Sequence, residues 1–204
     1  MNGAQALIEC LKREQVTQIF GYAGATICPA ADALKDTPEI AYTLVRTEQN
    51  AGHMASGYAR VSGKVGVCMV TSGPGATNLI TGIATAYMDS IPIVAITGQV
   101  PSHLLGRDIF QEVDITGAVA PFSKHSYLVK NVNDIPRVVR EAFHIASTGR
   151  PGPVLIDIPI DVQQATLKKF EWPETVNIRG YKPSVKGNDL QIKRVAATIA
   201  RAKQ

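Results

Sequence analysis

Glu48 is the side chain whose position in the sequence most clearly allows chemistry. It follows the apolar stretch 42–45, which predicts a β-strand, and it begins a stretch rich in alanine and glycine that predicts a helix over 48–60. In a parallel α/β fold, ligands bind at the carboxyl ends of the strands, so a lone acid at this junction would face a ligand. A single carboxylate can share a proton with a ring nitrogen of that ligand. The alternative is that Glu48 is only an acid in a first helical turn, where the helix dipole favours it.

A glycine-rich turn, Ser72-Gly-Pro-Gly75, follows the apolar stretch 65–70 and is the second candidate for ligand binding. It is not a phosphate-binding P-loop, because the chain contains no Gly-Lys-Ser or Gly-Lys-Thr triplet. It also departs from the dinucleotide-binding pattern, which requires a third small residue where Asn78 stands. On its own the turn is explained equally well as a tight connection between a strand and a helix.

Other common active-site chemistries find no support in the sequence. No Gly-x-Ser-x-Gly motif is present, which argues against the usual hydrolase nucleophile. The cysteines and histidines do not fall at metal-ligand spacings, so no metal site is predicted within the chain. The cysteines form no Cys-x-x-Cys pair, and their odd number favours a reducing, cytoplasmic setting. These residues are Cys10, Cys28, Cys68, His53, His103, His125 and His144.

Strands and helices alternate along the first part of the chain. Short apolar stretches between glycine and proline turns predict strands, and apolar residues at helical spacing predict helices between them. This alternation predicts an α/β fold, a doubly wound and mostly parallel sheet of about six strands with helices on both faces. The predicted strands are 18–20, 42–45, 65–70, 92–97, 126–129 and 153–158, and the predicted helices are 4–12, one opening at Pro29, 48–60, 79–88 and 135–147.

The junctions that follow these strands should meet at one edge of the sheet, because parallel strands end on the same side. The junctions are the segments 21–26, 71–78 and 98–101 and the acid Glu48. We therefore expect a site assembled at this edge from segments far apart in the sequence.

The chain from residue 164 onward differs in character from the predicted domain 1–163. Prolines and scattered charges predict a linker over 164–187, and apolar residues at helical spacing predict that 188–204 begins a further, truncated domain. Nine basic and three acidic side chains lie beyond residue 163, in a chain of net charge +4. These charges are dispersed and no aromatic platform accompanies them, so no nucleic-acid site is predicted. No apolar run is long enough to span a membrane and the first residues do not predict a secretory leader, so no membrane association is predicted.

Several long motifs lie along the predicted domain in a fixed order, at 46–60, 71–79, 96–101, 110–112 and 149–153. They include Arg-Thr-Glu-Gln-Asn-Ala-Gly-His and Thr-Ser-Gly-Pro-Gly-Ala-Thr-Asn-Leu. Together they resemble the thiamine-diphosphate enzymes, and most of all the family of acetohydroxyacid (acetolactate) synthase large subunits. The resemblance implies a thiamine-diphosphate-binding fold in which residues 1–163 are the amino-terminal, pyrimidine-binding domain of a larger subunit.

The resemblance also implies roles for individual residues. In that family the acid that matches Glu48 hydrogen-bonds N1′ of the cofactor's aminopyrimidine and favours the imino tautomer that activates the cofactor. Gly24, Pro74, Gly75 and Asn78 would line the pyrimidine pocket. The family's reaction decarboxylates pyruvate and ligates the remaining two-carbon unit to a second 2-keto acid, in branched-chain amino acid biosynthesis.

Three further residues acquire roles from the same resemblance. Phe110 and Gln111 would stand near the substrate channel, and Arg150 would contact FAD, which has no redox role in the family's main reaction. Without the resemblance, Phe110 is explained as a core residue, Gln111 as a loop surface group and Arg150 as the charged end of a helix. The family holds Mg²⁺ and the cofactor's diphosphate with a Gly-Asp-Gly motif, which this chain does not contain. We therefore expect the chain alone to be inactive and to bind thiamine diphosphate weakly or not at all.

The resemblance extends to partners and leaves alternatives open. It implies a homodimer or a larger assembly, and a regulatory small subunit. The alternatives are another thiamine-diphosphate enzyme, such as a pyruvate oxidase, a glyoxylate carboligase or a sulfoacetaldehyde acetyltransferase, and a non-catalytic nucleotide-binding α/β module.

Two departures from the family pattern are present. Ala23 and Ala25 stand where the family usually has proline and glycine, and they change the turn only modestly. Ile160 stands where biosynthetic members commonly have a lysine near the FAD and the substrate channel, which weakens the assignment of both but leaves that of Glu48 intact.

Overall fold

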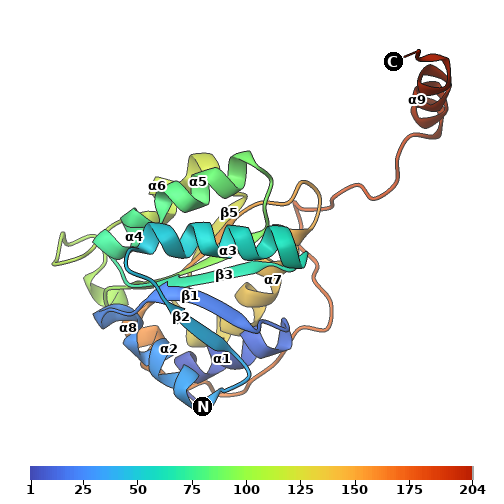
Figure 1. Ribbon diagram of the computed structural model, residues 1–204. Coiled ribbons are helices and arrows are strands. Elements are labelled where there is room, and N and C mark those ends of the chain that lie inside the picture. The colour runs from blue at the N-terminus through green and yellow to red at the C-terminus, as the bar shows by residue number, and fades with distance from the viewer. Residues whose placement is uncertain (204) are drawn as a thin grey trace.

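Six parallel strands form one sheet within residues 1–203, the part of the chain that the computed structural model describes (Figure 1). The strand order is β2-β1-β3-β4-β6-β5, and every neighbouring pair is parallel. The strands are β1 (Gln18–Tyr22), β2 (Ala41–Leu44), β3 (Gly66–Val70), β4 (Ile93–Gln99), β5 (His125–Leu128) and β6 (Val154–Pro159).

Helices cover both faces of this sheet and create two apolar cores (Figure 1). The helices of one face are α1 (Gly3–Arg13), α2 (Cys28–Ala33), α7 (Ile135–Ser147) and α8 (Ile160–Gln164). Those of the other face are α3 (Glu48–Ser62), α4 (Pro74–Asn78), α5 (Ile80–Met88) and α6 (Ile115–Val119).

The central strand β3 shows why its sequence is an unbroken apolar run. Met69 packs in the core with α1 and α7, whereas its neighbours Cys68 and Val70 pack in the core with α3 and α5. All three side chains are fully buried. Because neither face of the strand meets solvent, every position is apolar, as expected of a parallel sheet covered on both sides.

The helices α3 and α5 approach each other closely because each has a glycine at the contact. A Cβ built on Gly52 would lie 3.0 Å from Gly82 Cα, and one built on Gly82 would lie 2.8 Å from Gly52 Cα. A side chain at either position would push the helices apart. The contact therefore fixes the spacing between the amino end of α3 and the helices α4 and α5.

The structure confirms the predicted α/β fold, with a sheet that is parallel at every pair. The predicted helix over 79–88 is confirmed as α5, which begins at Ile80, whereas the short helix α4 that precedes it was not predicted. Gly73 turns the chain with a φ of +58°, and proline is well suited to a first helical turn. The helices α6 and α8 were not predicted, since five residues are too few to show helical spacing.

The segment that follows α8 runs along the domain without forming a helix before α9 (Asp189–Arg201). Tyr181 accepts a 2.8 Å hydrogen bond from Lys124 Nζ and donates one of 2.8 Å to the Thr148 carbonyl. The helix α9 stands apart from the sheet and buries no residue (Figure 1). The division into a domain 1–163, a linker and a further domain stays a prediction. Within residues 1–203, every helix is too short or too polar to cross a lipid bilayer.

Candidate functional site

The chain reverses direction across the sheet between β1 and β3. From β1 it runs outward to the edge strand β2, and it then returns to β3 on the opposite side of β1. Such a reversal leaves a crevice outside the carboxyl ends of the two central strands, where α/β proteins commonly bind ligands. The segments after β1 and β3 border this crevice.

Two threonines join the segment after β1 to the segment after β3. Thr26 Oγ1 lies 2.9 Å from Thr71 Oγ1 and accepts a 3.0 Å hydrogen bond from the Ser72 N–H. Gly24 packs on Thr71 so closely that a Cβ there would lie 2.7 Å from the threonine side chain. A Cβ on Gly98 of β4 would lie 2.5 Å from the Thr26 carbonyl oxygen. The predicted meeting of these three segments at one edge is confirmed.

Gln163 of α8 reaches the same edge from the face of the sheet that α1, α2 and α7 cover. Its side chain is fully buried, and its amide donates hydrogen bonds to the Thr26 carbonyl at 2.7 Å and to the Ile158 carbonyl at 2.9 Å. The end of the domain is thereby tied to the first turn of the site.

Glu48 and Asn78 form the polar centre of the edge. Glu48 is the first residue of α3, and Asn78 is the last residue of α4. The side-chain amide of Asn78 donates a 2.9 Å hydrogen bond to Glu48 Oε2. Glu48 Oε1 accepts no hydrogen bond from the described residues 1–203. The protein thus orients one oxygen of this half-buried carboxylate and leaves the other for a ligand.

The turn between β3 and α4 brings backbone close to that free oxygen. A Cβ built on Gly75 would lie 3.3 Å from Glu48 Oε1 and 2.7 Å from Thr71 Cγ2. The absence of a side chain at Gly75 therefore lets Thr71 and the Glu48 carboxylate pack closely against this turn. Pro74, at the start of α4, is exposed at the rim of this turn.

A loop that follows β4 leans on the same turn. A Cβ on Gly73 would meet the Cα and carbonyl oxygen of Gln111 at 2.8 Å, so the loop backbone touches the turn. Gln111 itself has a φ of +60°, and Asp108 in the same loop has a φ of +52°. Phe110 is 87% exposed, so its explanation as a core residue is wrong. The structure brings Gln111 to the rim of the site and leaves Phe110 projecting beside it.

Glu112 holds that loop from within. Its carboxylate accepts hydrogen bonds from the backbone N–H of Gly106 and, at 3.1 Å, from that of Ile109. These N–H groups stabilise the charged form and lower the pKa of Glu112 below its ordinary value. The loop is therefore shaped by its own hydrogen bonds.

Arg150 lies away from Glu48. It precedes β6 and so stands at the amino edge of the sheet, where it donates a 2.7 Å hydrogen bond to Ser90 Oγ. Its guanidinium also donates to the carbonyl oxygens of Tyr87 and Met88, each at 3.3 Å. A cation at the carboxyl end of α5 is favoured by the helix dipole. A contact of Arg150 with FAD stays a prediction.

Ile160 lies at the start of α8, on the carboxyl side of β6. It lines a cavity of about 630 Å³ together with Ala25, Cys28 and Lys35. The cavity opens beside the turn after β1, so Ala25 and Ile160, two of the three residues that depart from the family pattern, line the same cavity.

One acid at the carboxyl edge was missed by the sequence analysis. Asp157 of β6 is only 1% exposed and accepts hydrogen bonds from Thr97 and Gln99 of β4. Burial raises the pKa of Asp157 to about 7, although the two hydrogen bonds oppose the shift. The signal was present in the sequence, because Asp157 is the one charged residue in the apolar strand predicted over 153–158.

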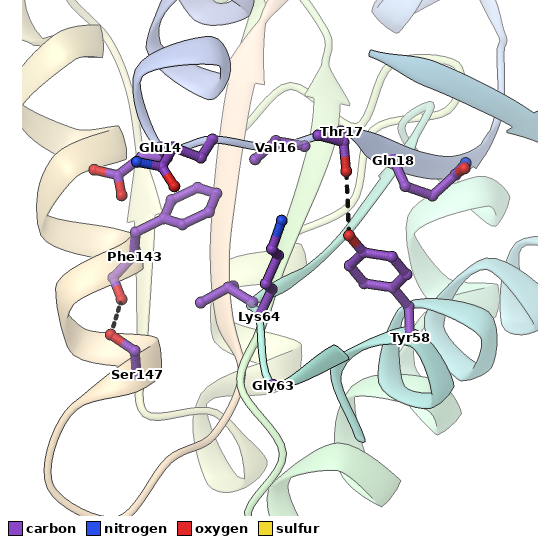
Figure 2. A pocket seen from close by; sticks show the side chains of 11 residues that line it. Glu14, Val16, Thr17, Gln18, Tyr58, Gly63, Lys64, Phe143 and Ser147 are labelled. Carbon is purple, nitrogen blue, oxygen red and sulfur yellow. Dashed lines mark hydrogen bonds between the residues drawn. The ribbon is translucent and has the colours of Figure 1, made fainter. Parts of the chain in front are cut away.

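A cavity of about 240 Å³ lies at the opposite edge of the sheet (Figure 2). It is lined by the segment before β1, the segment between α3 and β3, and α7. Thr17 and Tyr58 are joined by a 3.2 Å hydrogen bond at its wall, and the Lys64 side chain projects between them and Phe143 (Figure 2). It shares no residue with the edge that holds Glu48, so it is not part of the candidate site.

The residues around Glu48 fit a flat, largely apolar ring that carries one polar atom. Among residues 1–203, neither Glu48 Oε1 nor the buried Ser72 hydroxyl at the same edge has a hydrogen-bond partner, and Gly24 and Gly75 let the two turns pack closely on Thr71. No group of three or more His, Cys, Asp or Glu side chains within residues 1–203 is arranged to hold a metal ion. The site can therefore orient a ring and share a proton with it.

Known proteins resemble the chain over its whole length. It is 53% identical to an acetolactate synthase of Mycobacterium bovis, of which it covers 33%. It is 52% identical to the acetolactate synthase large subunit of Buchnera aphidicola and covers 36% of that protein. It is 51% identical to a probable acetolactate synthase large subunit of Methanocaldococcus jannaschii and covers 35% of it. The chain thus spans about a third of the length of the curated relatives it matches.

A family model supports the same relationship over the first part of the chain. Residues 1–118 match the model described as thiamine pyrophosphate enzyme, N-terminal TPP binding domain. The matched residues include both partners of the Glu48–Asn78 hydrogen bond and the whole turn between β3 and α4. Since this match covers more than half of its length, the chain belongs to the thiamine pyrophosphate enzymes, as an N-terminal TPP-binding domain.

Proposed function

We propose that this chain forms the aminopyrimidine-binding part of a thiamine-diphosphate-dependent acetolactate synthase. The observation that carries the proposal is the Glu48 carboxylate, with one oxygen oriented by Asn78 and the other free beside Gly75. The acetolactate synthases that resemble the whole chain support the choice of reaction.

Glu48 would share a proton with a ring nitrogen of the aminopyrimidine. The hydrogen bond from Asn78 fixes Oε2, so the free Oε1 is the atom that meets the ring. The amino end of α3 stabilises the negative charge that Glu48 carries when the proton is on the ring. The bound cofactor supplies the electron sink for decarboxylation, and the protein supplies orientation and the proton.

Small and rigid residues would set how closely the ring approaches. Gly24 and Gly75 lack side chains where a Cβ would meet Thr71, and Pro74 gives the turn a fixed backbone. Phe110 and Gln111, on the loop above Gly73, would border the path of the 2-keto acid.

The remaining parts of the proposal concern the whole enzyme, in the cytoplasm. Mg²⁺ and the cofactor's diphosphate would be held outside residues 1–204, beyond the linker 164–187 and in company with the domain that 188–204 begins. FAD would contact Arg150. The substrates would be pyruvate and a second 2-keto acid. The pyrimidine domain would meet a second subunit in a homodimer or larger assembly, to which a regulatory small subunit binds.

The substitution Glu48→Gln in the protein expressed from its complete gene tests the proposal. Glutamine keeps an oxygen for Asn78 but cannot take a proton, so acetolactate formation from pyruvate should fall by about a hundredfold or more. The matched control is Glu39→Gln, which changes an exposed acid paired with Lys12 at the surface and should leave the rate unchanged.

Two outcomes would count against the proposal. Full activity of a correctly folded Glu48→Gln variant would remove Glu48 from the reaction. A wild-type protein that converts pyruvate to another product would assign the chain to a different thiamine-diphosphate enzyme.

A further inference from the structure

A second reversal of the sheet lies between β4 and β6. The chain passes from β4 to the edge strand β5 and returns to β6, which pairs with both. Thr97 of β4 and Asp157 of β6 are opposite each other in the ladder, and Gln99 lies two residues further along β4. All three polar side chains are buried, with Asp157 and Gln99 only 1% and 2% exposed.

These side chains form a continuous set of hydrogen bonds that ends in the loop after β4. Asp157 accepts from Thr97 Oγ1 at 2.6 Å and from Gln99 Nε2 at 2.9 Å. The same amide donates a 2.8 Å hydrogen bond to the Val113 carbonyl, and Gln99 Oε1 accepts from the Val100 N–H at 2.9 Å. Every polar atom of the Gln99 side chain is therefore used, and its orientation is fixed.

A cavity lies between this loop and the ends of the strands. Its volume is about 310 Å³, and Gln99, Asp157, Leu105, Glu112 and Val113 line it. Hydrogen bonds hold the loop at the rim of this cavity: the internal ones to Glu112, and the one from Gln99 to Val113.

Burying a carboxylate costs desolvation free energy that an apolar side chain at the same position does not cost. The presence of Asp157 in the middle of an apolar strand is explained if it does something that an apolar side chain cannot do. Orienting the Gln99 amide toward the loop is such a task, because only an acceptor at position 157 holds that amide in place.

We propose that Asp157 is a positioning residue for the 2-keto-acid side of the site. Asp157 orients the Gln99 amide, and that amide binds the Val113 carbonyl of the loop. In the same loop, Gln111 packs on Gly73 and Phe110 is exposed beside it. The link to the 2-keto acid rests on the proposed function, whereas the link from Asp157 to the loop does not.

The test compares four variants of the protein expressed from its complete gene. The hydrogen bonds that link Asp157, Gln99 and Val113 are here called the relay. Asp157→Leu and Gln99→Met break the relay, and Asp157→Asn retains an oxygen for the Gln99 amide. Leu155→Ala, also buried in β6 but not one of the hydrogen-bonded residues, controls for lost stability. The first readout is hydrogen exchange of the backbone amides of residues 106–113.

Exchange of those amides should rise about tenfold in Asp157→Leu and Gln99→Met, the upper end of the loss expected for one hydrogen bond. Asp157→Asn should restore most of the protection, and Leu155→Ala should leave it unchanged. The double variant Asp157→Leu/Gln99→Met should exchange no faster than either single one, because both break the same relay. Equal exchange in Asp157→Leu and Leu155→Ala would overturn the proposal.

The second readout is steady-state kinetics with pyruvate. The KM for pyruvate should rise about tenfold in Asp157→Leu and Gln99→Met, with the concentration of thiamine diphosphate needed for half activation unchanged. A looser loop with an unaltered KM would overturn the role toward the 2-keto acid. If the wild-type protein makes no acetolactate, the proposed function fails, and the exchange measurement still decides whether Asp157 positions the loop.

Discussion

Asn78 donates its side-chain amide to Glu48 at 2.9 Å, although 30 residues of chain separate the two. One residue begins α3 and the other ends α4, so no flexible loop carries either of them. The contact between Gly52 and Gly82 sets the spacing of the helices behind them. The direction of the Glu48 carboxylate is therefore a property of helix packing.

The first prediction concerns Asn78→Leu, which leaves Glu48 Oε2 without its donor. A hydrogen bond to a charged acceptor contributes about 1.5–3 kcal/mol, so kcat/KM for pyruvate in the complete protein should fall by about tenfold or more. Thr77→Ala is the control, since the Thr77 hydroxyl donates to the Pro74 carbonyl of its own helix. Equal losses in the two variants would show that the helix and not the hydrogen bond had been disturbed.

The second prediction separates two glycines in the same pair of helices. Gly82→Ala should destabilise the protein by about 1–3 kcal/mol, because its Cβ would collide with Gly52. Gly57→Ala in α3 should stabilise it by about 0.5–1 kcal/mol, since a Cβ there meets nothing within 4 Å. The measurement is the urea midpoint of each variant, and a shift in the same direction for both would contradict the close packing of α3 on α5.

The third prediction concerns pH. The folded pKa of Asp157, raised by burial from an ordinary value of 3.8 to about 7, means that the folded state binds this proton more tightly than the unfolded state. Its contribution to stability is present below about pH 4 and is lost as the pH rises through 7, a change of at most about 4 kcal/mol. The nearby Asp114 adds to the rise in pKa.

Asp157→Asn removes this dependence. Relative to the wild type, the variant should gain at least about 1 kcal/mol of unfolding free energy between pH 5 and pH 8, measured with urea at each pH. A difference between variant and wild type that is the same at both pH values would show that Asp157 does not titrate in this range.

The fourth prediction concerns the chain by itself. Titration calorimetry of the 204-residue chain with thiamine diphosphate and Mg²⁺ should detect only binding weaker than about 1 mM, because the chain has no Gly-Asp-Gly motif for the diphosphate. The protein expressed from its complete gene is the positive control. Micromolar binding by the short chain would mean that the diphosphate is held by residues among these.

Features set by local sequence were predicted well. The buried runs of β3 and β4, the junction at Glu48 and the meeting of the strand ends follow from apolar pattern, glycine turns and the common direction of parallel strands. Arg150 shows the same rule from the other side, because a residue just before a strand must lie at the amino edge.

Features set by strand order and helix packing were not predicted. The hydrogen bond between Glu48 and Asn78 depends on the approach of α3 to α5, and that of Asp157 with Gln99 depends on β6 lying beside β4. The spacing of the residues along the chain predicts neither the contact between α3 and α5 nor the pairing of β4 with β6. The unpredicted helix α4 follows a positive φ at Gly73, a conformation that glycine permits but that its presence in the sequence does not predict.

The hydrogen bond from Gln163 to the Thr26 carbonyl spans 137 residues. During translation, Thr26 leaves the ribosome long before Gln163 is made. The hydrogen bond that ties the first turn of the site to α8 can therefore form only after α8 has been made. A nascent chain that stops before α8 exposes this carbonyl to water and leaves the sheet edge unsealed. During synthesis from the amino terminus, the edge that holds Glu48 is therefore complete only when the chain has emerged through α8.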